Sequence, residues 1–221
     1  MNYVSERDIQ DIVARVLSQQ GLGCGAKGSS CGQEIPVEIS ARHVHLDEAA
    51  LEVLFGKGAK LTPKRDLSQP KQYLSEERVK LVTARGQIEN VAVLGPVRPH
   101  TQVELSLTDA RILGVKAPVR LSGDLTGAAD VIIVGPKGIV EAKGSAIVAK
   151  AHVHMTDEEA RRYGVKNGDT VRIRMGEERP VTLENVLVRS GEGHALAVHI
   201  DYDEANAAQV SGTNITGYLL K

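Results

Sequence analysis

The stretch ISARHVHLDEAALEVLFGKGAKL at residues 39–61 has a related second copy, VAKAHVHMTDEEARRYGVKNGDTVRI, at residues 148–173. Each copy carries a His-Val-His triplet, and the two triplets lie 109 positions apart (43 to 152). A third fragment, LTDARILGVKAPVRL at residues 107–121, resembles the second half of this unit, a capped short helix followed by a turn into a strand. The repeat predicts two related halves, which fit two barrel-like domains better than one unbroken barrel.

Short apolar runs separated by Gly, Pro and Asp turns fill the chain from Ile35 onward, and their Val, Ile and Leu often alternate with polar residues, as in half-buried strands. The predicted strands are residues 35–40, 78–84, 88–95, 102–107, 117–123, 130–136, 138–143, 145–155, 169–175, 181–189, 194–200 and 215–220. Short helices are predicted at Asp47–Leu54, Thr108–Leu113, Asp157–Tyr163 and Asp203–Ala208. This spacing favours barrels over a βαβ sheet. We therefore predict a mainly β fold with short α-helices: two tandem β-barrel domains, residues 35–127 and 128–221, with a boundary near Gly123–Ala128.

Residues 1–20 differ from the rest of the chain and predict an amphipathic helix. Its apolar side chains recur at helical spacing on one face, at Ile9, Ile12, Val13, Val16 and Leu17. Residues 21–34 are rich in glycine and serine and predict a flexible linker. A short amphipathic helix on a tether can dock on a partner, or it can pack on its own domain or on a second subunit. The residues alone leave both alternatives open.

The composition is that of an ordinary globular protein and argues against several partners. Of the 221 residues 42% are hydrophobic, the net charge is −1 and only 3% are aromatic, so nucleic acid is not an expected partner. No apolar run approaches the roughly 20 residues that span a bilayer, and the first residues lack the pattern of a secretory signal. The expected compartment is the cytosol, with no membrane association.

The two His-Val-His triplets are the strongest chemical signal. Residues i and i+2 of a β-strand point to the same side, so His43 and His45 would lie side by side, with Val44 turned into the core. His152 and His154 repeat the arrangement. Imidazole is a preferred ligand of zinc. One pair alone could line a polar surface, but two pairs within a repeat predict a metal site.

Two pairs that each bind an ion would need two further ligands, because a catalytic zinc takes three protein ligands and keeps one position open. Glu104 and His199 are the candidates, because both lie in strand-like runs. Each could instead be an outward-facing polar residue in ordinary strand alternation. Arg98 lies between two prolines and could bind a phosphate or carboxylate, although by the sequence alone a surface arginine in a turn is the better explanation. His100 and His194 carry weaker signals, and His194 is predicted to be exposed.

Other reaction classes lack support in the sequence. Cys24 and Cys31 lie in the predicted linker and are too loosely spaced for a zinc knuckle, so they are interpreted as incidental thiols. Neither a phosphate-binding G-x-x-x-x-G-K-[ST] loop nor a G-x-S-x-G nucleophile motif occurs in the chain.

Five motifs occur together and in order: ISARHVHL, GPVRPHTQVELS, LTDARILG, AKAHVHMT and AVHIDYDEANA. With them the chain, from about Ile35 to its end, resembles the phosphate propanoyltransferases of bacterial microcompartments. The resemblance implies two β-barrel domains, two zinc ions and the conversion of acyl-CoA and phosphate to acyl phosphate and coenzyme A. It also implies an N-terminal helix that serves as an encapsulation peptide, binding shell or core enzymes of a microcompartment.

Carried over motif by motif, the resemblance implies a role for nine residues. His43, His45 and Glu104 would hold one zinc ion, and His152, His154 and His199 the other. Arg98 would bind phosphate, and Ser40 and Asn206 would line the coenzyme A side. The expected reaction is direct acyl transfer in a ternary complex, with propanoyl-CoA or acetyl-CoA as donor.

Two alternatives remain at this point. The same ligands could activate water, which would make the protein a dinuclear zinc hydrolase of thioesters or phosphoesters. The zinc could instead stabilise a non-catalytic module of a microcompartment. The acyl-chain preference, the pathway (propanediol and ethanolamine degradation are both candidates) and self-association through the N-terminal helix are left open by the sequence.

Overall fold

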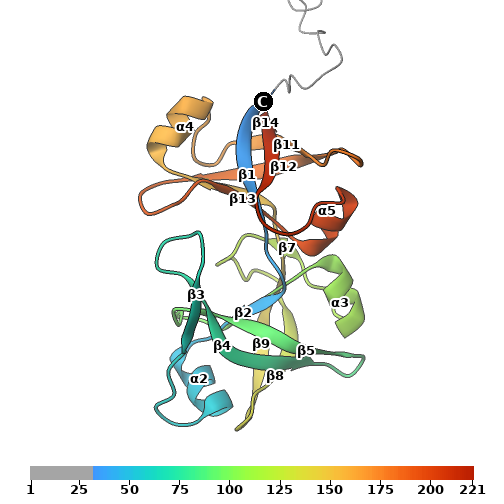
Figure 1. Ribbon diagram of the computed structural model, residues 1–221. Helices are drawn as coiled ribbons and strands as arrows, with labels where there is room; N and C mark the ends of the chain where they lie inside the picture. Colours follow the sequence, from blue (N-terminus) through green and yellow to red (C-terminus); the bar gives the residue numbers. More distant parts are fainter. Residues whose placement is uncertain (1–31) are drawn as a thin grey trace, which may run out of the picture.

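The computed structural model describes residues 32–221, which form two closed six-stranded β-barrels with four short helices, stacked one above the other (Figure 1). The mainly β fold with two barrels is therefore confirmed. The predicted helix at residues 1–20 and residues 21–31 of the predicted linker lie outside the described residues. Gln33 and Glu34, the last residues of that predicted linker, already belong to the first strand, β1.

The first barrel, in the lower half of Figure 1, closes through strand pairs in the order β4-β5-β2-β6-β9-β8 and back to β4. Its strands are β2 (His43–His45), β4 (Tyr73–Val82), β5 (Gln87–Gly95), β6 (Gln102–Leu105), β8 (Ala129–Val134) and β9 (Ile139–Ala149). Two short strands, β3 (Pro63–Asp66) and β7 (Val119–Arg120), pair with β4 and β9. β3 was not predicted, because Pro-Lys-Arg-Asp has no apolar alternation and all four residues are exposed.

The second barrel closes in the order β1-β13-β10-β12-β11-β14. Its strands are β1 (Gln33–Ile39), β10 (His152–Met155), β11 (Thr170–Met175), β12 (Val181–Ser190), β13 (Ala197–Ile200) and β14 (Ile215–Leu220). β1 pairs with β13 on one side and β14 on the other, so the first described strand completes the barrel formed by the last strands.

The predicted domain limits, 35–127 and 128–221, do not match these strand pairs. β1 precedes the first barrel in the chain but belongs to the second, while β8 and β9 follow residue 127 but pair with β4 and β6 of the first. The chain thus starts in the second barrel, crosses to the first, and returns between β9 and β10. The glycine-containing turn at residues 123–128 reverses the chain direction between β7 and β8 within one barrel. Glycine-rich turns occur wherever the chain reverses, so this one does not mark a domain boundary.

Four short strands are each followed by a capped helix. The helices are α2 (Glu48–Phe55) after β2, α3 (Leu107–Leu113) after β6, α4 (Asp157–Tyr163) after β10 and α5 (Tyr202–Ala207) after β13. Their caps are Asp47, Ser106, Thr156 and Asp201, whose side chains accept a backbone N–H of the first turn. The four predicted helices are confirmed within one residue at each end.

The two barrels are related in their strand pairing as well as in sequence. β2 pairs in parallel with β5 and antiparallel with β6, and β10 pairs in the same way with β12 and β13. Each barrel has its own apolar core, in which Val44 and Val153 are 0% exposed. The predicted inward position of both valines is confirmed, which directs the histidines of each triplet away from the barrel cores. Among the described residues, no helix is long and apolar enough to cross a membrane.

Candidate metal and substrate site

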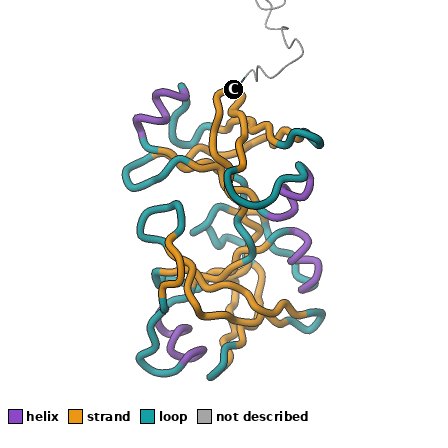
Figure 2. Tube along the Cα trace, viewed as in Figure 1, coloured by secondary structure: helices purple, strands orange, loops and turns teal. Residues whose placement is uncertain are grey.

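A cavity of about 670 Å³ is lined by residues of both barrels. Figure 2 shows loops of the two barrels facing each other where the barrels meet. The cavity lining includes both histidine pairs, Glu104 and His199. Side chains that lie far apart in the sequence thus reach one site, because each barrel contributes a short His-Val-His strand and the strand that pairs with it.

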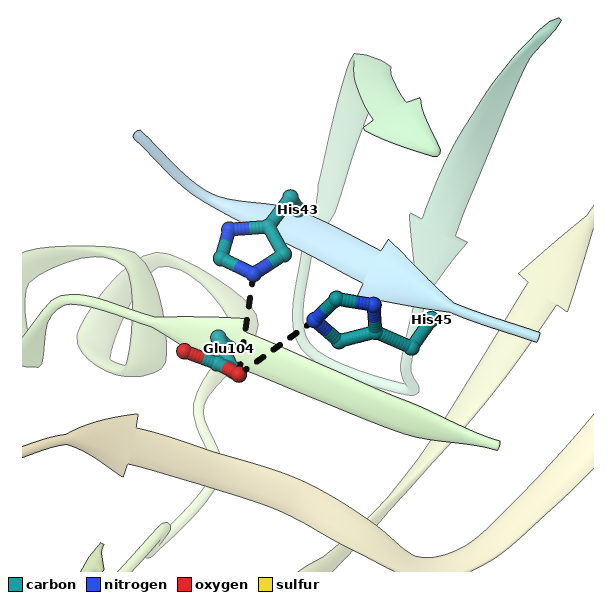
Figure 3. A group of neighbouring side chains, drawn as sticks. All are labelled: His43, His45 and Glu104. Carbon is teal, nitrogen blue, oxygen red and sulfur yellow. Dashed lines mark ion pairs between the residues drawn. The ribbon is translucent and has the colours of Figure 1, made fainter. Parts of the chain in front are cut away.

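The first group consists of His43, His45 and Glu104. β2 and β6 are antiparallel and place His43 directly opposite Glu104. Glu104 Oε1 lies 3.6 Å from His43 Nε2 and 3.5 Å from His45 Nε2 (Figure 3). All three side chains are buried, and their candidate ligand atoms lie within 4.8 Å of one another. Two imidazole nitrogens and a carboxylate oxygen converging in this way are a suitable ligand set for zinc.

The second group consists of His152, His154 and His199. β10 and β13 place His152 opposite His199, the position that Glu104 has in the first barrel. His152 Nε2 and His154 Nε2 are 3.2 Å apart. The His199 ring lies 5.2 Å from the ring of each of the other two, measured between centroids. The pairing of His199 with the second triplet thus follows from the same strand register as that of Glu104 with the first.

One nitrogen of the first histidine in each pair is held by the backbone. His43 Nδ1 lies 2.8 Å from the carbonyl of Ala41, and His152 Nδ1 lies 2.8 Å from that of Lys150. A carbonyl only accepts, so Nδ1 carries the proton and donates it, and Nε2 of the neutral ring keeps its lone pair. This arrangement is the usual support for a metal-binding histidine.

The second histidine of each pair has an unusual environment. Among the described residues, His45 Nδ1 and His154 Nδ1 are the two buried side-chain nitrogen or oxygen atoms without a hydrogen-bond partner. A buried polar atom without a partner costs about 1–3 kcal/mol. The two unpaired nitrogens lie at matching positions of the two barrels. Such a cost at both positions is expected where the histidines are placed to bind a ligand and not only to pack within the protein.

Burial keeps most of these imidazoles neutral. It lowers the pKa of His45 to about 4, and together with the charge of His152 it lowers the pKa of His154 to about 2 and that of His199 to about 3. Burial also lowers the pKa of His43, but attraction by the Glu104 carboxylate outweighs it and raises that pKa above its usual value. Neutral imidazole is the form that binds a metal ion.

Glu104 is charged in spite of its burial. Burial alone would raise the pKa of its carboxyl group, but His43 and His45 hold the pKa well below its usual range. A buried carboxylate is costly unless a positive charge or hydrogen bonds offset it. The buried charge among imidazole nitrogens therefore favours a cation at this position.

Arg98 lies on the cavity wall and is held by a neighbouring side chain. Its backbone N–H donates to the carbonyl of Leu46, and its Nη1 donates to Ser122 Oγ at 2.9 Å. Burial lowers the pKa of Arg98, which a guanidinium tolerates without losing its proton. The side chain thus presents a fixed positive charge to the same cavity as the two histidine groups.

The structure brings Ser40 to the cavity and leaves Asn206 outside it. Ser40 lines the wall, and its N–H donates to the carbonyl of Ile200. Asn206 is exposed on α5 and is not among the cavity residues. His194, predicted to be exposed, is partly buried, because the loop before β13 places its ring 4.4 Å from that of His154.

Arg189, Gln69 and Gln102 are among the residues at the site that were not predicted from the sequence. Arg189 lines the cavity because β12 pairs it with His154, a register that the sequence alone does not reveal. Gln69 lies in the loop between β3 and β4, and no sequence pattern marked it. Gln102 precedes Glu104 by two residues, so strand alternation could have placed it on the same side as that carboxylate.

Arginine side chains give the cavity a positive lining. Five of them line it: Arg42, Arg65, Arg78, Arg98 and Arg189. Two carboxylates, Glu38 and Glu104, line it as well, and the buried imidazoles add no charge where they are neutral. The excess of guanidinium groups over carboxylates suits an anionic substrate, since arginine binds phosphate groups through paired hydrogen bonds.

Comparison with known proteins assigns a family to this arrangement. The family model for phosphate propanoyltransferase matches residues 36–211. The phosphate propanoyltransferase of Alkaliphilus metalliredigens is 43% identical over 219 residues, which cover 99% of this chain and 100% of the relative. That of Priestia megaterium is 48% identical over 216 residues, with 98% and 97% covered. That of Sebaldella termitidis is 49% identical over 177 residues, with 80% and 83% covered.

Proposed function

The chain belongs to the phosphate propanoyltransferase family, and we propose that it transfers a propanoyl group from coenzyme A directly to phosphate at a site with two zinc ions. Acetyl-CoA is a second candidate donor. Membership of the family makes the protein an acyltransferase. The observation that carries the finer proposal is the convergence of two similar three-residue groups and Arg98 on one cavity.

Each group would supply three ligands to a catalytic zinc ion, and the candidate ligand atoms of the first group lie within 4.8 Å of one another. His43, His45 and Glu104 would hold one ion, and His152, His154 and His199 the other. Zinc bound there would polarise the thioester carbonyl and stabilise the departing thiolate. The protein contributes neutral imidazoles held in orientation by the carbonyls of Ala41 and Lys150.

Arg98 is the proposed phosphate-binding residue. Its hydrogen bond to Ser122 fixes the direction of the guanidinium, and Arg189 adds a second positive charge to the same cavity. Holding phosphate beside the thioester makes the attack effectively intramolecular and offsets the charge that develops. Phosphate then attacks the carbonyl carbon, the carbon–sulfur bond breaks, and coenzyme A leaves as the thiolate.

We assign Ser40 to the coenzyme A side of the site. It lies on the cavity wall, where a substrate could reach it. Asn206 would have to act from outside the cavity. Direct transfer needs no acyl-enzyme, so replacement of both Cys24 and Cys31 by serine should leave turnover unchanged. Loss of the chemical step in that double variant would contradict direct transfer.

The experiment that tests this function combines metal analysis with a measurement of coenzyme A release. The zinc-loaded protein should release coenzyme A from propanoyl-CoA only when phosphate is present and should form propanoyl phosphate. Release without phosphate would favour the alternative, a zinc hydrolase. A zinc-containing protein that forms no acyl phosphate and unfolds when the metal is removed would favour a non-catalytic microcompartment module.

The cellular setting is also a proposal. A family member with an N-terminal amphipathic helix is expected inside a microcompartment, where residues 1–20 would bind shell or core enzymes or mediate self-association. Deletion of those residues should release the protein from the microcompartment fraction without changing its activity in vitro. Retention of the truncated protein in that fraction would contradict the targeting role.

A further inference from the structure

Gln102 is a buried glutamine whose side chain is hydrogen bonded to Glu104 and to Ser122, and Ser122 in turn contacts Arg98. It lies on β6, two residues before Glu104, and is 3% exposed. It does not line the cavity, so it cannot touch the substrates directly. Any effect on the reaction must therefore pass through its neighbours.

Both functional ends of the Gln102 amide are hydrogen bonded. Nε2 donates to Glu104 Oε1 at 2.6 Å and to Ser122 Oγ at 3.0 Å. Oε1 accepts the backbone N–H of Gly123 at 2.9 Å. The two amide hydrogens and the carbonyl oxygen are thus all in use, and the amide has one possible orientation. Turning it over would set its oxygen against the Glu104 carboxylate.

The oxygen of Glu104 that Gln102 binds is the one that faces the histidines. Oε1 is 3.6 Å from His43 Nε2 and 3.5 Å from His45 Nε2. A glutamic acid side chain has three rotatable bonds, so its oxygen stays in this position only if another group holds it. The hydrogen bond from Gln102 Nε2 supplies that restraint on the same oxygen.

Ser122 extends the connection to the arginine. Its Oγ lies 3.0 Å from Gln102 Nε2 and accepts a hydrogen bond from Arg98 Nη1 at 2.9 Å. The turn that carries Ser122 is held by the bond from Gly123 to the same glutamine. Gln102 therefore contacts the carboxylate ligand directly and the arginine through one hydroxyl group.

We propose that Gln102 is a positioning residue that fixes the Glu104 ligand atom and the Arg98 guanidinium relative to each other. This inference rests on the proposed function, since it assigns the two ends of the connection to metal and phosphate. It applies to the first barrel alone. Strand register places Gln102 opposite His45, and the matching position opposite His154 is Ala197, which has no polar side chain.

The test replaces Gln102 with methionine, which is similar in length but supplies no amide. Outer-shell partners of metal ligands typically contribute 10–100-fold to affinity. Gln102→Met should therefore release one of two zinc ions to a chelator at least tenfold more readily, and His45→Ala identifies the ion of the first group. The same variant should raise the KM for phosphate severalfold and leave the KM for acyl-CoA unchanged.

Ser122→Ala separates the two branches. It removes the acceptor of Arg98 but leaves the bond from Gln102 to Glu104, so phosphate KM should rise while zinc affinity changes less than about twofold. Gln87→Met on β5 is the matched control, because Gln87 is exposed and outside the site. Its zinc affinity and kinetic constants should equal those of the wild type.

The outcomes separate this inference from the proposed function. Unchanged zinc affinity and phosphate KM in Gln102→Met would refute the positioning role, even with a fully active wild type. Chelator competition needs no turnover, so an inactive wild-type protein would contradict the proposed function and still test the link to Glu104. A folded Gln102→Met protein with equal rises in both KM values would also count against the proposal.

Discussion

At the scale of single residues, hydrogen bonds fix which nitrogen atoms of the site carry protons and where those protons point. His43 and His152 donate Nδ1–H to carbonyl groups two residues earlier, so in the neutral rings Nε2 keeps the lone pair that the proposed metal site needs. Gln102 uses its amide hydrogens on Glu104 and Ser122. In the proposed metal sites these atoms are thereby oriented before an ion binds, which lowers the entropic cost of binding.

The first prediction concerns Arg98. In Arg98→Ala the guanidinium is lost from the cavity, and turnover should fall by about 100-fold, the effect of removing one charge-stabilising donor from an active site. Zinc content should stay at the wild-type level, because Arg98 donates to Ser122 and to neither histidine group. Arg111→Ala, at an exposed position of α3, is the control. Full activity in Arg98→Ala would remove this residue from the mechanism.

The second prediction concerns the stability of the metal-free protein. The folded pKa values of His45, His154 and His199 are lowered to about 4, 2 and 3, against roughly 6.5 in an unfolded chain. Below pH 6.5 the unfolded state therefore binds more protons, and stability falls as the pH decreases. His43 and Glu204 oppose this trend, since the pKa of each is raised, that of Glu204 to about 7 by burial.

Thermal unfolding in the presence of a chelator measures the balance of these groups. The midpoint should fall steadily between pH 6.5 and pH 5, because these three histidines, together with His152 and His194, whose pKa values burial also lowers, outweigh His43 and Glu204. His154→Asn removes one of the three and should make the slope shallower. A midpoint that is constant or rises over this interval would show that the histidines are not held neutral in the folded protein.

At the scale of elements, the repeated unit is a short strand followed by a capped helix. In β10 the histidines point to the cavity while Val153 fills the core of the second barrel. The ladder pairs of His152 with Leu187 and His199 hold the strand on both sides. Alternate residues of β10 therefore have different roles: the valine packs in the barrel core, and the histidines face the cavity.

The third prediction uses this separation. Val153→Ala removes two buried methyl groups and should lower the free energy of unfolding by about 2 kcal/mol. Zinc content and turnover at 25 °C should remain, because the backbone pairs that orient the histidines are unaffected. Val53→Ala, at a site 48% exposed on α2, should change stability by less than about 0.5 kcal/mol. Loss of zinc from folded Val153→Ala protein would show that the two tasks are coupled.

Local patterns allowed the elements to be predicted. Capping residues followed by apolar spacing located α2, α3, α4 and α5 within one residue at each end. Alternation in His-Val-His placed the imidazoles on one side and the valine in the core. The exposed Pro-Lys-Arg-Asp of β3 was missed, since pairing with β4 rather than its own side chains makes it a strand.

Contacts between distant segments could not be predicted in the same way. Arg189 reaches the site through the register of β12 against β10, and Gln69 through a loop without a motif. The boundary near residue 127 was wrong because a turn does not reveal which strands will pair across it. The pairing of strands that are distant in the sequence depends on the whole barrel, so it cannot be predicted from a short segment of the chain.

At the scale of the whole molecule, the two barrels are interlocked by the path of the chain and by contacts across their junction. β1 leaves the second barrel and leads into β2 of the first (Figure 1). Gln69, from the first barrel, donates to the carbonyl of Ala195 at 2.9 Å and accepts the N–H of Ala195 at 3.2 Å. Thr108 N–H of α3 donates to Asp203 of α5. These contacts hold the two halves of the cavity together.

The last prediction follows from the position of β1. A fragment of residues 128–221 lacks β1, so one edge of β13 and one of β14 are unpaired, and it carries β8 and β9 without their partners β4 and β6. Unpaired edges and exposed apolar strands lead to aggregation. The fragment should show no cooperative thermal unfolding. A chain of residues 151–221 joined by a short glycine linker to residues 32–40 should fold, because Leu219 lies opposite Gln33 and the linker has little distance to cover. Cooperative unfolding of the 128–221 fragment would mean that the second barrel closes without β1, and the strand order described above would then not determine its stability.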